Sequence, residues 1–410
     1  MTQPAFAHRL LPPGTAPEAL RLLFARALRG FADGYVSVLL PAYLLALGFG
    51  RFDVGVLSTA TLAGSAFATL ALGAFGHRWP SRRLLQGAAL LMAATGAAFA
   101  GLASFWPLLV VAFVGTLNPS SGDVSVFLPL EHARLASAAT GHARTALYAR
   151  YSLAGALSAA VGALAAGLPP WLAVRAGVPL ETGLRAMFAL YGVIGAVVWW
   201  LYRRLPAPAR GVDSAPAPLG PSRPVVVRLA ALFSIDAFAG GLVVNALLAL
   251  WLFERFGLSL GQAGLFFFTT GLLSAGSQLA AAPVARRFGL LNTMVYTHIP
   301  SSLCLIGAAF APALPLALGL LFVRSALSQM DVPTRTAFVM AVVTPAERTA
   351  AASFTTVPRS LAAAASPALA GAWMAAGWLA APLVACGGLK IVYDLALLFA
   401  FRDVRLPDGD

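Results

Sequence analysis

An acid and a base lie four residues apart in the middle of an apolar stretch of the chain. The segment from Leu314 to Val343 is long enough to cross a bilayer, yet it contains Asp331, Pro333 and Arg335. Residues at i and i+4 share one face of a helix, so the acid and the base can form an ion pair. Charged groups at membrane depth are costly, and by default they mark an ion pair or a site for protons or solute. The proline is expected to loosen the helix and to free a carbonyl group.

The same kinds of charged residue recur in the two halves of the chain. They appear in the same order, at a near-constant offset of roughly two hundred positions, as an internally duplicated transporter predicts. The matching pairs are Asp33 with Asp236, Asp123 with Asp331, and Arg150 with Arg359.

Apolar segments of membrane-spanning length position these charges. Of the 410 residues, 59% are hydrophobic and only 10% are charged, a composition too apolar for a water-soluble fold of this size. Segments of about 20 residues or more suffice to cross the bilayer as helices. We therefore expect an all-α membrane protein with twelve spans, at about 20–48, 54–76, 84–103, 107–129, 143–168, 183–203, 226–252, 261–284, 290–311, 314–343, 349–377 and 381–401.

The net charge of +13 follows the ends of these spans, so it indicates membrane topology and not a nucleic-acid partner. Arginines gather on alternate connections, which predicts that both termini are cytoplasmic. Lys390 is the only lysine, and the bias to arginine favours a GC-rich bacterial genome and hence a bacterial inner membrane. A Pro/Ala/Ser-rich segment at 205–225 is expected to be a cytoplasmic linker. It divides the chain into six-helix bundles at 1–204 and 226–410.

The loop after the second span, GAFGHRWPSRR, resembles the pattern Gly-x-Leu-Ala-Asp-Arg-x-Gly-Arg-Lys of the major facilitator superfamily. Twelve spans, a central linker and weakly similar halves extend the resemblance over the whole chain. A base replaces the acid of the pattern in both halves. The residues that carry the motif are Gly73, His77, Arg78 and Arg82 in the first half, and Arg286 and Arg287 in the second.

This resemblance implies two pseudo-symmetric bundles in which spans one, four, seven and ten line a central cavity. Asp33 and Asp236 lie on two of these spans without a base at i±3, which makes them candidates for proton coupling or cation binding. Arg29, one turn before Asp33, is expected to extend to the lipid headgroups. Polar residues expected to face the cavity are Asn118, Ser121, Asn245, Ser328 and Gln329.

Two further pairs, Asp123 with Arg150 and Asp331 with Arg359, are expected at matching depths. They are either structural or gating ion pairs or direct solute contacts. Lys390 and Asp394 form an i,i+4 pair on the twelfth span, which is peripheral in the family, and a structural role is expected there.

The function favoured by these residues is secondary active transport by alternating access. We expect a proton-coupled exporter of a cationic or amphipathic small molecule; the alternative is a small anion held by the membrane arginines. An intramembrane aspartyl protease and a channel are remote alternatives. The chain has no phosphate-binding loop, and clustered cysteine and histidine are absent from the cavity spans, so we expect no enzyme activity, cofactor or metal. The expected partners are a solute, protons and the bilayer, with the protein as a monomer.

Overall fold

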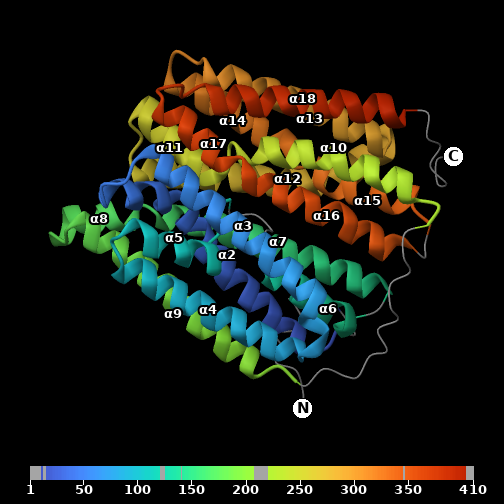
Figure 1. Ribbon diagram of the computed structural model, residues 1–410, viewed down its shortest axis with the longest axis horizontal. Coiled ribbons are helices and arrows are strands. Elements are labelled where there is room, and N and C mark those ends of the chain that lie inside the picture. Colours follow the sequence, from blue (N-terminus) through green and yellow to red (C-terminus); the bar gives the residue numbers. More distant parts are fainter. Residues whose placement is uncertain are drawn as a thin grey trace. The chain divides into compact units, whose positions relative to one another are not determined.

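The computed structural model describes residues 11–12, 15–120, 125–139, 141–206, 220–344 and 347–402, and every regular element within these ranges is a helix (Figure 1). The expected all-α fold is therefore confirmed. Two predicted site residues, Asp123 and Ser121, lie outside the described residues, as does most of the predicted linker.

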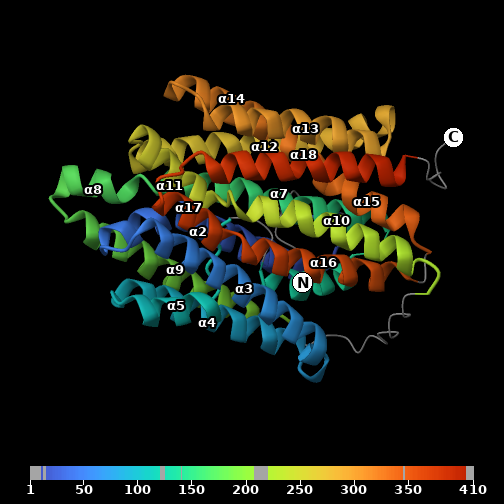
Figure 2. The same ribbon diagram turned by 45° about the horizontal axis from the view of Figure 1, so that its top comes forward.

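The chain divides into two compact units, of which the first comprises Met1–Gly50, Ala60–Val212 and Leu258–Phe268. Within it, α2 packs against α7 and α9, and α4 packs against α9 (Figure 2). The helices that begin in the first half of the chain are α2 (Glu18–Ala46), α3 (Arg51–Phe75), the short 3-10 helix η1 (Gly76–Arg78), α4 (Ser81–Gly101), α5 (Phe105–Val114), α6 (Phe127–Ala138), α7 (Gly141–Ala165), α8 (Leu168–Ala176) and α9 (Leu180–Arg203).

Small residues allow these helices to approach closely. A Cβ atom on Gly34 of α2 would lie 2.0 Å from the carbonyl oxygen of Ala159 on α7. A Cβ atom on Gly96 of α4 would lie 2.2 Å from the backbone nitrogen of Gly192 on α9. Close backbone contact of this kind is how membrane helices gain packing energy without a hydrophobic driving force between them.

The second unit comprises Arg51–Thr59, Asp213–Gly257 and Thr269–Asp410. The first residues of α3 thus group with the second unit, and the first residues of α12 group with the first. Within the second unit, α10 packs against α16 and α18, and α13 packs against α14 and α18. Its helices are α10 (Arg223–Gly241), α11 (Asn245–Phe256), α12 (Leu260–Phe288), α13 (Leu290–Ala309), α14 (Leu314–Ser328), α15 (Asp331–Val342), α16 (Arg348–Ala365), α17 (Pro367–Ala375) and α18 (Ala381–Phe401).

Several expected spans are interrupted. The predicted fourth span covers α5 and only the start of α6, and the predicted tenth covers α14 and α15. Pro333 lies in the first turn of α15, where a helix has no intrahelical partner for the backbone N–H. The expected loosening is observed as a full break at Gln329 and Met330, because Pro333 has no N–H to donate to the carbonyl group four residues before it. The break precedes Asp331, which becomes the first residue of a new helix.

Seven helical segments of the described chain are long and apolar enough to cross a membrane, as judged by length and composition. The other expected spans are interrupted by a turn or carry buried polar residues. The seven segments are Arg51–Phe75, Ser81–Gly101, Ala143–Ala176, Leu180–Arg203, Arg223–Phe256, Leu260–Phe288 and Ala381–Phe401.

Candidate functional site

Asp236 of α10 lies at the centre of a buried ionic cluster in the second unit. Its Oδ1 atom accepts a hydrogen bond of 2.5 Å from Nζ of Lys390 on α18. Its Oδ2 atom accepts one of 3.0 Å from Nη1 of Arg335 on α15. Nε2 of His298, on α13, lies 3.9 Å from Oδ1. One carboxylate therefore joins side chains from three other helices, and the expectation that Asp236 has little basic company was wrong.

Arg335 bridges two carboxylates. Besides Asp236, its Nη1 atom lies 3.2 Å from Oδ2 of Asp331, which confirms the ion pair predicted from the i,i+4 spacing. The guanidinium carbon also lies 5.5 Å from the ring centre of Phe233, a distance at which a cation interacts with an aromatic face. Arg335 is 6% exposed, and both acids are also buried. The charges are consequently paired away from solvent.

His298 extends the cluster toward Asp394. Its Nδ1 atom lies 3.0 Å from Oδ1 of Asp394, and its Nε2 atom lies 3.4 Å from Nζ of Lys390. The predicted local pair of Lys390 with Asp394 was therefore wrong, because each of the two contacts a residue on another helix. We call Asp236, Asp331, Arg335, Lys390, His298 and Asp394 the Asp236 cluster.

Arg359 of α16 lies beside this cluster. It interacts electrostatically with Asp236, Asp331 and Arg335. Within the described part of the chain, no carboxylate lies within ion-pair distance of its guanidinium, and the contact partner of Asp331 is Arg335. The predicted ion pair between Asp331 and Arg359 is thus not formed in this structure.

A second ionic cluster is buried in the first unit. Glu131 of α6 is fully buried and forms a salt bridge with Arg29 of α2. Its carboxylate also accepts hydrogen bonds from the hydroxyl groups of Tyr151 and Tyr202, the latter at 2.6 Å. The Arg29 guanidinium lies 4.1 Å from the ring centre of Phe127. Arg29 is 2% exposed, so the expectation that it extends to the headgroups was wrong. These residues, without Phe127, form the Glu131 cluster.

The two clusters link corresponding helices of the two units, but the acid and the base have exchanged places. In the first unit the base is on the first helix, α2, and the acid is on the second part of the broken fourth span. In the second unit the acid is on α10, and the base is on the second part of the broken tenth span. In each unit a buried ion pair therefore joins the first helix to the segment that follows a helix break.

Asp33 lies one turn after Arg29 on α2 and is 7% exposed. Asp33 interacts electrostatically with the guanidinium group of Arg29 and with the hydroxyl groups of Tyr35 and Tyr191. The structure therefore places Asp33 within reach of the Glu131 cluster, in a buried polar environment.

The remaining predicted residues are dispersed. Arg150 is half-buried, while its predicted partner Asp123 lies outside the described residues. Asn118 is buried and accepts a hydrogen bond of 2.7 Å from the Ser120 hydroxyl group. Gln329 accepts one of 3.3 Å from Gln278. Asn245 and Ser328 are half-buried at helix ends.

The loop motif lies at helix ends in both units. Arg82 donates a hydrogen bond of 3.1 Å to the backbone oxygen of Leu205. Arg286 and Arg287 are exposed in the last turn of α12. Gly73 and Arg78 are exposed, and His77 lies in η1.

Comparisons with known proteins identify the family of the chain and structures with a similar fold. Residues 22–330 match the sequence pattern of the Major Facilitator Superfamily. An uncharacterized membrane protein of Saccharomyces cerevisiae is 25% identical over 427 residues, covering 95% of each chain. The mutant nucleoside transporter NupG has a similar fold, with a TM-score of 0.73 and 14% identity over 94% of this chain and 100% of that one.

Two other solved structures share the fold. A bacterial homolog of the human lysosomal transporter Spinster gives a TM-score of 0.75 at 16% identity, covering 98% of both chains. A D-xylose–proton symporter gives a TM-score of 0.71 at 17% identity, covering 95% of this chain and 99% of that one. The expected twelve-helix fold agrees with these likenesses, and the chain is a multi-pass membrane protein that belongs to the Major Facilitator Superfamily.

Proposed function

We propose that this protein is a proton-coupled secondary transporter of a small solute and that the Asp236 cluster is its coupling site. The observation that carries the proposal is the buried Asp236 carboxylate, which contacts bases from α15 and α18. A proton on this carboxylate would cancel the charge that holds Lys390 and Arg335 in place. Because Lys390 and Arg335 favour the charged carboxylate, Asp236 would take up a proton only when these contacts open, and proton release would let the contacts re-form.

His298 supports a path for the proton. An imidazole has two ring nitrogens, so it can take up a proton on one and release a proton from the other. Its two ring nitrogens lie beside Asp394 and Lys390, at 3.0 and 3.4 Å. A proton could then pass between Asp394 and the neighbourhood of Asp236 through one imidazole.

The charges around Asp236 favour an anionic solute over the cationic one expected from the sequence. Asp236 and Asp331 already contact bases, so a cation would have to displace Lys390 or Arg335. Arg359 has no carboxylate at ion-pair distance among the described residues, and its guanidinium would donate hydrogen bonds to a carboxylate or phosphate of the solute. We therefore propose a small organic or inorganic anion as the solute class.

We further propose a monomer working by alternating access, with both termini in the cytoplasm. Arginine-rich alternate connections support this topology. Export, and location in a bacterial inner membrane, stay predictions from the sequence.

The test uses purified protein in liposomes that contain a pH-sensitive dye. Anionic, cationic and neutral solutes are added in turn, and solute-induced proton flux is recorded. We expect anions to produce flux in the wild type and in the exposed control variant Glu181→Gln. Asp236→Asn should abolish this flux, because the amide mimics a permanently protonated acid.

Loss of folding must be separated from loss of coupling. Asp236→Asn leaves two buried bases with less compensation, so the double variant Asp236→Asn with Lys390→Met should fold better while still lacking proton flux. His298→Gln should slow the flux at least tenfold. Full flux in both Asp236→Asn and His298→Gln would refute the assignment of the coupling site, and flux with cations alone would refute the solute class.

A further inference from the structure

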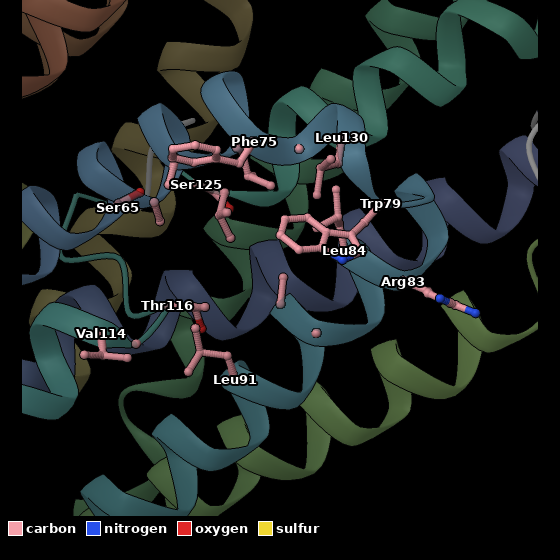
Figure 3. A pocket seen from close by; sticks show the side chains of 18 of the residues that line it. Ser65, Phe75, Trp79, Arg83, Leu84, Leu91, Val114, Thr116, Ser125 and Leu130 are labelled. Carbon is pink, nitrogen blue, oxygen red and sulfur yellow. The ribbon is translucent and has the colours of Figure 1, made fainter. Parts of the chain in front are cut away.

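We propose that a pocket in the first unit binds one acyl chain of an anionic bilayer phospholipid. The pocket lies between α3, α4, α5 and α6 and has a volume of about 540 Å³ (Figure 3). That is within the range of roughly 300–1,000 Å³ typical of small-molecule sites. None of the residues of the Asp236 or Glu131 clusters lines it, so it is separate from the proposed coupling site.

Two helix faces form apolar walls of this pocket. On α3 the lining residues recur at helical spacing, and the same is true on α4. Gly87 on α4 leaves room, since a Cβ atom there would meet nothing within 4 Å. A wall of this kind suits a hydrocarbon chain, because it offers few polar groups to a hydrophilic solute. The wall residues include Ser65, Ala68, Leu72 and Phe75 from α3, and Leu84, Gly87, Ala88 and Leu91 from α4.

One end of the pocket lies next to the end of α5. Val114, the last residue of α5, and Thr116 lie on the side away from Arg83 in Figure 3. Ser125, which precedes α6, and Leu130 in α6 also line the pocket.

The opposite end of the pocket is basic and aromatic. Arg78, Trp79 and Arg83 line it, and all three are exposed. The Arg83 side chain extends away from the apolar walls in Figure 3. Guanidinium groups bind phosphate oxygens well, and tryptophan is enriched where membrane meets water. No carboxylate is among the described lining residues to repel a phosphate.

The charge at this end decides the class of lipid. Two arginines beside an apolar pocket favour an anionic headgroup, such as that of phosphatidylglycerol, over a zwitterionic one. A phospholipid is the favoured occupant because one molecule carries both an acyl chain that matches the apolar walls and a phosphate that matches the basic end.

Trp79 provides the measurement. Phosphatidylglycerol with brominated acyl chains, which quench tryptophan fluorescence, is added to the full-length protein in detergent. The fluorescence of Trp79 is obtained by subtracting the signal of Trp79→Phe from that of the wild type. We expect saturable quenching. Gly87→Leu, which fills the pocket, should abolish it, whereas Gly101→Leu should not. Gly101 is a matched control on the same helix, because its Cβ would also meet nothing within 4 Å and it does not line the pocket.

The headgroup is tested by the paired change Arg78→Gln with Arg83→Gln. It should weaken phosphatidylglycerol binding about tenfold or more, while Arg203→Gln should leave binding unchanged. Brominated phosphatidylcholine should bind the wild type correspondingly more weakly, and soluble glycerol phosphate should not displace the lipid. Quenching that persists in Gly87→Leu would overturn the pocket assignment. Equal binding of both lipids, or displacement by glycerol phosphate, would overturn the anionic lipid as occupant.

Discussion

Removing the guanidinium of Arg29 should destabilise the first unit strongly. In Arg29→Met, the carboxylate of Glu131 would be left fully buried with only two tyrosine hydroxyl groups as partners. Breaking a buried ion pair on one side costs about 3–5 kcal/mol. The remaining tyrosine hydrogen bonds favour the lower end, about 3 kcal/mol, which for a unit of this size corresponds to about 6–12 °C in Tm.

The assay is thermal unfolding in detergent, and a matched pair in the same unit is the control. Arg185 and Glu181 lie 2.9 Å apart at i,i+4, with side chains 33% and 50% exposed. Arg185→Met should therefore cost only about 0.3–0.5 kcal/mol, or about 1–2 °C.

The double variant Arg29→Met with Glu131→Gln should recover at least half of the loss. It removes both buried charges and keeps an oxygen that can accept from the tyrosines. Equal Tm losses for Arg29→Met and Arg185→Met would refute the reasoning. So would strictly additive losses in the double variant, since additivity means that the two charges do not interact.

The other predictions concern a loop carboxylate and a helix contact. Hydrogen bonds from Ser222, Thr344 and Gly220 lower the pKa of Glu347 from its ordinary value of 4.5 to about 2. Its stabilisation is therefore complete above about pH 4.5 and is lost as the pH falls through 2, so the Tm difference between wild type and Glu347→Gln should shrink from pH 6 to pH 3. A constant difference would contradict this. Gly34→Ala should lower the free energy of unfolding by about 1–3 kcal/mol, because its Cβ atom would clash with Ala159, whereas Gly276→Ala, with an open Cβ position, should not. Equal effects of the two changes would contradict the close contact.

Local spacing predicted the helices and one ion pair correctly. Apolar length identified most of the helical segments, and the i,i+4 rule identified Asp331 with Arg335. Both depend on residues that are near each other in sequence. The breaks in the fourth and tenth spans were missed although polar residues mark both of them, because the hydropathy of a whole span does not record where one helix ends and another begins.

The partners of Asp236 could not be found in this way. Lys390 and His298 come from α18 and α13, at sequence separations that no helical period connects. Glu131 was missed for another reason, since it lies just beyond the expected end of the fourth span and was not considered at membrane depth. A signal was present in Arg29, because a base inside an apolar segment implies an acid elsewhere. Tertiary packing decides which acid that is.

Because Lys390 is the single lysine of the chain, the Asp236 cluster can be labelled selectively. Amine-directed reagents have one side-chain target in all 410 residues, and that side chain is 13% exposed, with its ammonium group beside Asp236. Surface lysines, which usually obscure such labelling, do not occur. The rate at which a small acylating reagent modifies Lys390 would therefore record how often this part of the second unit opens to water, without any engineered label.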